Sequence, residues 1–228
     1  MKYNLIKKIG KIALLAQILY LSNPGEKAIA PEFKSLPIEY SKPLKEDRRK
    51  VVILDPGHGM GNRVKGLMDW GISYQKYKEA EIVLDKAKNI EKMLDPTKYK
   101  VILTRKDNET HCPIESRPEI ANENNADIFI SFHTNDYKGW KSINGSEIYW
   151  REKKDRELAK LAAKDLEEIA GISNRWVIQE DYLMLKGVKC PAILLEIGYL
   201  INKENREKIL NESGVEKAVV KTVEVFLN

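Results

Sequence analysis

The sequence predicts an α/β fold, a three-layer sandwich in which a largely parallel central sheet is flanked by helices. Short apolar runs alternate with amphipathic helical patterns over residues 50–228. The runs are continuous rather than alternating with polar residues, which is typical of strands buried on both faces of a parallel sheet. No repeat or shift in composition divides this part of the chain, so we expect one domain.

The expected strands are four apolar runs, which occupy residues 51–54, 101–103, 128–132 and 192–195. Between and after these runs, apolar residues recur at the three- and four-residue spacing of helices that bury one face. The expected helical stripes are Val83, Ala87, Ile90 and Leu94; Leu158, Leu161, Ala162, Leu166 and Ile169; and Val215, Val219, Thr222 and Phe226. This alternation of strands and helices favours a sheet with helices on its faces.

The first 30 residues are expected to be a signal peptide or an N-terminal anchor. Four lysines precede a short apolar run at residues 12–21. A secretory signal has such a basic start and an apolar stretch of about 7–15 residues, whereas a spanning helix needs about 20. An amphipathic helix is the alternative. We therefore expect export to the periplasm, the cell wall or the extracellular space, with a membrane tether if the segment is not cleaved.

Residues 31–49 are rich in proline and charge and are expected to form a linker or arm before the domain at 50–228. The formal net charge is +5, of which residues 1–30 carry +4, leaving +1 for the rest. This distribution does not indicate a nucleic-acid partner, because nucleic-acid-binding domains cluster their basic residues on the folded part. Cys112 and Cys190 are expected to be buried apolar side chains rather than a disulfide, and no CxxC pair suggests a cysteine zinc site.

Three of the apolar runs lead directly into ionisable side chains. His58 follows the first run, His133 the third and Glu196 the fourth. Because the carboxyl ends of parallel strands meet at one edge of a sheet, we expect these side chains to converge. Two histidines and a carboxylate are a known ligand set of catalytic zinc, which keeps a fourth position for water. The spacing alone leaves hydrogen-bonded structural histidines as the alternative.

Six short motifs between Val51 and Asn202 resemble, in their order, those of the zinc-dependent N-acetylmuramoyl-L-alanine amidases, the family called amidase type 3. Each motif alone is weak, and their shared order makes the resemblance specific. The motifs are DPGHG at 55–59, EAEIVL at 79–84, LTR at 103–105, a block from Arg117 through AN and AD to SFHTN at 131–135, GSEIY at 145–149, and PAILLEIGY at 191–199 followed by Asn202.

The resemblance implies that His58, Glu79 and His133 bind Zn²⁺ and that Glu196 is the catalytic general base. Glu81 is the rival ligand in the same helical turn, and Glu79 is preferred because the apolar residues after it then match the family pattern. Without the resemblance, Glu79 would be interpreted as a solvated acid in a first turn, where the helix dipole favours negative charge. Residues that bind the substrate stay unassigned.

The resemblance also implies a reaction and its partners. We expect hydrolysis of the amide bond between N-acetylmuramic acid and L-alanine in peptidoglycan. The alternatives are a zinc metallopeptidase that cuts within the stem peptide and a non-catalytic wall-binding protein. Only about eight residues separate the strand ending near Trp150 from the helix containing Leu158, too few for the blocking helix of activator-dependent members. We therefore expect an open site that needs no activator protein. We also expect the protein to be a monomer.

The chain departs from the family pattern at two places, Met60 and the Arg175–Trp176 pair. Residues 62–78 are also more aromatic than a plain loop, with Trp70, Tyr74 and Tyr77. These rings either line a groove for sugar or peptide or pack on the domain surface. Such differences bear on the details of substrate binding more than on the reaction.

Overall fold

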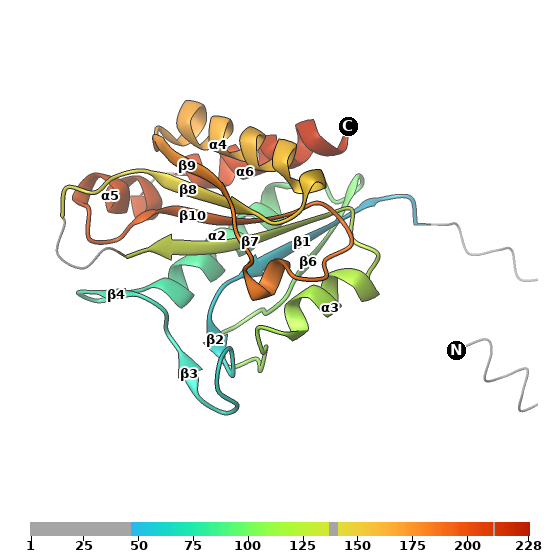
Figure 1. Ribbon diagram of the computed structural model, residues 1–228, viewed down its shortest axis with the longest axis horizontal. Helices are drawn as coiled ribbons and strands as arrows, with labels where there is room; N and C mark the ends of the chain where they lie inside the picture. The colour runs from blue at the N-terminus through green and yellow to red at the C-terminus, as the bar shows by residue number, and fades with distance from the viewer. Residues whose placement is uncertain (1–46, 137–140, 212) are drawn as a thin grey trace, which may run out of the picture. The chain divides into compact units, whose positions relative to one another are not determined.

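A computed structural model describes residues 47–136, 141–211 and 213–228. The expected signal peptide or anchor at 1–30 and nearly all of the expected linker at 31–49 lie outside the described residues. Within the unit from Asp47 to Asn228, six strands form a mixed sheet in the order β6-β1-β7-β10-β8-β9 (Figure 1). Two pairs of two-residue strands lie outside this sheet: β2 (Gly59–Met60) with β3 (Met68–Asp69), and β4 (Ser73–Tyr74) with β5 (Tyr77–Lys78).

The four predicted strands are confirmed, and they are neighbours that run parallel. They are β6 (Tyr99–Leu103), β1 (Lys50–Pro56), β7 (Ile128–Asn135) and β10 (Ala192–Tyr199). Next to β10 lies β8 (Ser146–Trp150), which is antiparallel to it, and β9 (Asn174–Gln179) pairs parallel with β8 at the edge. The sheet is therefore largely parallel, as predicted, with two reversed strands at one side.

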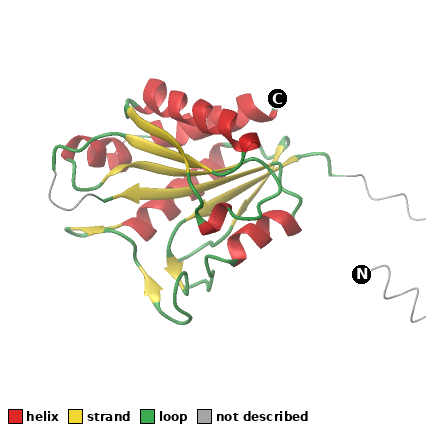
Figure 2. Ribbon diagram, viewed as in Figure 1, coloured by secondary structure: helices red, strands yellow, loops and turns green. Residues whose placement is uncertain are grey.

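Helices cover both faces of the sheet, which confirms the three-layer sandwich (Figures 1 and 2). One face packs against α2 (Glu79–Met93), α4 (Arg156–Ala170) and α6 (Gly214–Leu227). The other face packs against α3 (Ser116–Glu123) and the short 3-10 helix η2 (Leu183–Leu185). Successive side chains of a strand point to opposite faces, so Val52 and Leu54 join the first layer and Ile53 the second.

The predicted helical stripes are buried or partly buried with one exception. Ile169 is 40% exposed, so the prediction is wrong at this position. Ile169 lies in the last turn of α4, where its neighbour Ala170 contacts the start of α6. A β-carbon added to Gly214, the first residue of α6, would lie 2.9 Å from the Cα of Ala170. The close approach of the α4 and α6 backbones therefore buries the small side chain of Ala170 and leaves the larger side chain of Ile169 exposed.

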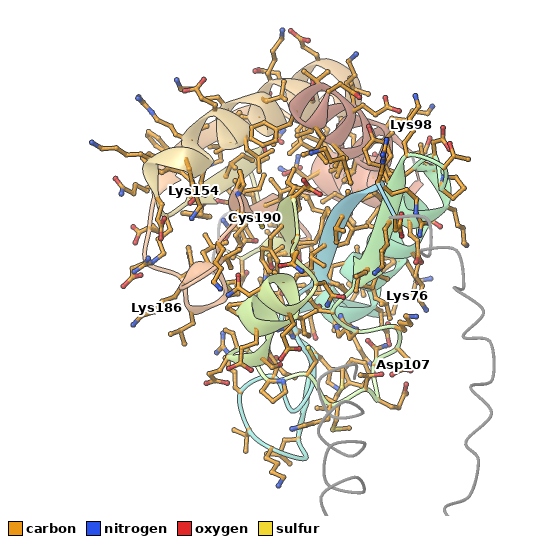
Figure 3. All side chains as sticks on the ribbon, turned by 90° about the vertical axis from the view of Figure 1, so that its right-hand side faces the viewer. Lys76, Lys98, Asp107, Lys154, Lys186 and Cys190 are labelled. Atoms are coloured by element: carbon orange, nitrogen blue, oxygen red, sulfur yellow. The ribbon has the colours of Figure 1, made fainter. Side chains whose placement is uncertain are left out.

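The remaining described helices are α5 (Lys203–Asn211), which packs on β10, and the 3-10 helix η1 (Lys153–Asp155). Cys112 and Cys190 are buried free thiols, as predicted. Figure 3 shows Cys190 among packed side chains and Lys186 at the periphery. Within the described ranges, no helix has the length and apolar character needed to cross a membrane.

Candidate active site

The carboxyl ends of three neighbouring strands bring the predicted site residues to one edge of the sheet. His58 follows β1, His133 lies near the end of β7, and Glu196 of β10 is in register with His133. Glu79 joins them as the first residue of α2. The structure therefore brings all four side chains together, and all four line one cavity.

Three of these side chains direct a donor atom at a common point. Oε1 of Glu79 lies 3.0 Å from Nε2 of His58 and 3.0 Å from Nδ1 of His133, and the two nitrogens are 3.1 Å apart. Ligands at about 2.0–2.2 Å from a tetrahedral zinc ion are separated from one another by roughly 3.3 Å. The three atoms thus have nearly the spacing of one face of a tetrahedral zinc site.

Other polar atoms around the cluster lack aligned hydrogen bonds to any described residue. They are Nδ1 of His58, Nε2 of His133 and Oε2 of Glu196, all of them buried. Buried polar atoms are nearly always paired, and an unpaired group in a native fold points to a water, an ion or a catalytic role. The donor set fits a zinc ion held by His58, Glu79 and His133, and the unpaired carboxylate oxygen of Glu196 belongs to a residue that lines the same cavity.

Two glycines provide the space that the cluster occupies. A β-carbon on Gly57 would lie 2.2 Å from the imidazole ring of His133. A β-carbon on Gly71 would lie 2.4 Å from Oε2 of Glu79 and 2.7 Å from Nε2 of His58. Any side chain at either position would therefore displace the predicted ligands.

The two carboxylates in the first turn of α2 differ in how deeply they are buried. The side chain of Glu79 is 1% exposed and accepts hydrogen bonds from the backbone N–H groups of Thr134 (2.9 Å) and Ile72 (2.8 Å). The side chain of Glu81 is 44% exposed and faces Lys78 at 3.5 Å. Glu79 rather than Glu81 is therefore the residue that the fold brings to the cluster.

The electrostatic environments of Glu196 and Glu79 differ. Desolvation raises the pKa of Glu196 well above its ordinary value, and the nearby charge of Glu79 raises it further. Desolvation also opposes ionisation of Glu79, but contacts with His133 and His58 outweigh it and hold the pKa of Glu79 far below its usual range. The two site carboxyl groups therefore differ in their affinity for a proton, which is low for Glu79 and high for Glu196.

Two buried arginines hold the loop that carries His58. Arg117 donates a hydrogen bond of 2.7 Å to the carbonyl oxygen of His58, whose backbone has a left-handed φ of 61°. This conformation costs a non-glycine residue on the order of 1–3 kcal/mol, so it persists only where contacts fix it. Arg105 donates to the carbonyl oxygens of Gly57 (2.8 Å) and Ala80 (2.7 Å), which joins the loop to the start of α2.

Comparison with known proteins agrees with this geometry. A family model described as N-acetylmuramoyl-L-alanine amidase matches residues 52–225. The chain belongs to this amidase family. A Staphylococcus aureus protein named probable cell wall amidase LytH is 30% identical over an alignment of 229 positions, which covers 97% of this chain and 74% of the relative. A Staphylococcus saprophyticus protein of the same name is 29% identical over an alignment of 232 positions, with the same coverage of 97% and 74%.

Two solved amidase structures share the fold. The catalytic domain of CwlV from Bacillus (Paenibacillus) polymyxa var. colistinus is 28% identical with a TM-score of 0.67, over 78% of this chain and 98% of that one. The N-acetylmuramoyl-L-alanine amidase from Clostridium difficile 630 is 25% identical with a TM-score of 0.71, over 79% of this chain and 97% of that one. The α/β architecture is thus that of amidase catalytic domains.

The site of the amidase opens into a cavity of about 780 Å³. Its wall beyond the four site residues combines apolar and charged side chains, among them Ile114, Leu183 and Met184 with Arg63, Glu115 and Asp181. The aromatic residues of 62–78 are not part of this wall. Tyr74 and Tyr77 pack against the core, and Lys78 lies 3.8 Å above the ring of Trp70. These contacts agree with surface packing, the second of the two predicted alternatives.

Two acidic side chains near the site had no role in the sequence prediction, Asp69 and Glu147. Asp69 belongs to the two-residue strand β3, and the sequence offers no periodic signal at that position. Glu147 is in register with Glu196 in the sheet. The GSEIY motif at 145–149 was the available signal for Glu147, but it does not reveal the hydrogen-bond partners of the carboxylate. The carboxylate of Glu147 accepts hydrogen bonds from Asn135, Tyr149, Arg175 and Tyr199.

Proposed function

We propose that this amidase is a zinc enzyme in which His58, Glu79 and His133 hold the metal and Glu196 is the general base. The observation that carries the proposal is the convergence of three donor atoms, 3.0 to 3.1 Å apart, beside a desolvated carboxyl group. The family match supports the choice of bond, the amide between N-acetylmuramic acid and L-alanine in peptidoglycan.

Each residue has a definite task in this scheme. Bound zinc would supply an electrophile for the substrate carbonyl and lower the pKa of water to about 7. Glu196 accepts a proton from the attacking water and returns it to the L-alanine nitrogen as the C–N bond breaks. The raised pKa of Glu196 suits this exchange, because a carboxylate that regains a proton easily can also donate it.

Digestion of purified peptidoglycan tests the proposal. Residues 31–228, prepared with zinc, are incubated with the wall polymer with and without a zinc chelator, and the soluble products are analysed by mass spectrometry. We expect stem peptides that begin at L-alanine, and we expect their release to stop on chelation and return with added zinc.

The other outcomes distinguish the alternatives. Fragments cut inside the stem peptide would identify a metallopeptidase. Release that survives complete removal of the metal would contradict the zinc scheme. Binding to several wall types without any release would identify a non-catalytic wall-binding protein.

We also propose a division of labour along the chain. Residues 1–30 direct export or tether the protein, residues 31–49 form a linker, and residues 50–228 form the catalytic domain. The basic and apolar start supports this assignment, as do relatives named cell wall amidases. N-terminal sequencing of the protein recovered from the medium, wall and membrane fractions tests it. Recovery of the whole chain in the cytosol alone would contradict it.

We further propose that the catalytic domain acts as a monomer without an activator protein. Strand β8 ends at Trp150 and α4 begins at Arg156, with only the short η1 between them. This connection leaves no room for an inserted blocking helix. The purified domain alone, monomeric by light scattering, is expected to release peptides at a rate that adding a cell extract does not raise. A strict requirement for a second protein would contradict this proposal.

A further inference from the structure

Asp69 lies behind the predicted ligand His58, on the side away from the donor cluster. Its Oδ2 is 3.0 Å from Nδ1 of His58, whereas Nε2 of the same ring faces Glu79 and His133. The hairpin of β2 and β3 creates this contact, because its register sets Asp69 opposite Gly59, the residue after His58. A carboxylate thus stands at the second nitrogen of a ring whose first nitrogen faces the metal position.

The chemistry of imidazole makes this placement informative. A neutral histidine that binds a metal through Nε2 carries its single ring proton on Nδ1, which must then donate a hydrogen bond. Nδ1 of His58 is buried and, apart from its contact with Asp69, has no partner among the described residues. The carboxylate oxygen at 3.0 Å is an acceptor within reach of that proton.

Asp69 is itself held in place by two donors. The backbone N–H of Gly71 donates to its Oδ1 at 2.9 Å, and Nδ2 of Asn62 donates to its Oδ2 at 2.8 Å. Asn62 is oriented in turn by Arg117, whose guanidinium donates to Oδ1 of Asn62 at 3.0 Å. A carboxylate fixed in this way is pre-organised, so little ordering remains to be done when the metal binds.

We propose that Asp69 is a positioning residue of the metal site, whose carboxylate accepts the Nδ1 proton of His58 and so fixes the tautomer that presents Nε2 to zinc. The inference rests on the proposed zinc site and extends it to a residue that is not a ligand. Partners of this kind orient metal-binding histidines and raise their basicity, and losing one typically weakens metal affinity by about 10–100-fold.

Zinc affinity measured by competition with a chromophoric chelator tests this inference without any activity assay. We expect Asp69→Ala to bind zinc about 10–100-fold more weakly than the unaltered protein. Asp69→Asn, which keeps an oxygen acceptor without the charge, should lie between the two. Asp181→Asn is the matched control, because Asp181 lines the same cavity but pairs with Arg151 and is 72% exposed. Its zinc affinity should not change.

The position of the ring proton provides a second readout, which a merely structural role of Asp69 would not affect. With only three histidines in the chain, the ¹⁵N resonances of His58 in the zinc-loaded protein can be assigned by substitution. We expect an Nδ1–H signal that is protected from exchange with water in the unaltered protein and less protected in Asp69→Asn. This comparison stays decisive even if Asp69→Ala does not fold.

The outcomes distinguish failure of the proposed zinc site from failure of the proposed role of Asp69. If the unaltered protein binds no zinc, the proposed function fails. If it binds zinc tightly while both Asp69 variants bind it equally well and keep a protected Nδ1 proton, the zinc site stands and the role of Asp69 is refuted.

Discussion

Two glutamates at the site differ in what surrounds them. Glu79 accepts backbone hydrogen bonds and faces two imidazoles, whereas Glu196 has one carboxylate oxygen without a partner among the described residues. Their pKa values are displaced in opposite directions, down for Glu79 and up for Glu196. Carboxyl groups with such separated pKa values commonly have different tasks in one reaction. Glu79 suits a ligand, which must be ionised, and Glu196 suits a carrier of protons.

Replacing Glu196 by Gln tests this separation of tasks. Glutamine has nearly the same shape but cannot accept and return a proton, so kcat is expected to fall by about 10²–10⁴-fold. Zinc content, measured by atomic emission, should remain at the level of the unaltered protein. The control is Glu115→Gln, which changes another glutamate of the same cavity and should leave both quantities unchanged. Loss of zinc together with activity would reassign Glu196 as a ligand.

The space that Gly57 leaves for His133 leads to a second prediction. In Gly57→Ala the added methyl group would lie 2.2 Å from the imidazole ring, so the ring must move out of the cluster. We expect zinc affinity and activity to be lost together while the circular dichroism spectrum stays that of a folded domain. Gly187→Ala should retain zinc, because no atom lies within 4 Å of its added carbon. Its left-handed backbone would cost only about 1–2 kcal/mol of stability.

At the scale of the elements, one buried ion pair joins the core of the sheet to α3. Asp55 of β1 is fully buried and accepts hydrogen bonds from Thr104, Ser131 and Arg117. Desolvation opposes ionisation of Asp55, but Arg117 and the two hydroxyl groups outweigh it and lower the pKa of the carboxyl group. Arg117 therefore stabilises the end of β1 and the loop that follows.

Replacing Arg117 by Met should destabilise the fold strongly. The substitution leaves the charge of Asp55 buried without its partner, which typically costs about 3–5 kcal/mol in the free energy of unfolding. Urea denaturation measures the change. The control is Lys50→Met, which removes an exposed pair with Asp127 and should cost at most about 1 kcal/mol. Similar losses in both variants would show that the buried pair contributes no more than a surface one.

Elements that bury apolar runs could be predicted from the sequence, and elements at the edges could not. The four parallel strands have continuous apolar runs because helices cover both of their faces. Strand β9 lies at the edge of the sheet, and all six of its residues are exposed or only partly buried, so no apolar run marks it. The two-residue strands β2 to β5 are too short for any periodicity.

The dependence on buried apolar runs also limits which site residues could be predicted from the sequence. His58, His133 and Glu196 follow apolar runs, so the rule for parallel strand ends brings them together. The role of Glu79 came from the resemblance to a family, because an acid in a first helical turn is ordinarily a solvated residue. Asp69 reaches the site through the register of a short hairpin, and a single sequence does not reveal that register.

At the scale of the whole molecule, bound zinc should raise the stability of the catalytic domain. A ligand that binds only the folded state stabilises it by about 4 kcal/mol at 1,000 times its Kd. For a domain of this size, each kcal/mol corresponds to roughly 2–4 °C in the thermal midpoint. We therefore expect a midpoint roughly 8–16 °C higher with saturating zinc than after chelation, measured by calorimetry. An unchanged midpoint would contradict metal binding by the folded domain.

The positions of the three predicted ligands along the chain have a further consequence. His58 and His133 are 75 residues apart and Glu79 lies 54 residues before His133, yet their donor atoms meet within about 3 Å. A metal ion there is a cross-link that ties distant parts of the chain together, and it is made only after they have folded. The segment between His58 and Glu79 has little regular structure of its own, so zinc would fix both of its ends. Its amide protons should exchange more slowly with solvent in the presence of zinc, and proteases should reach it less often.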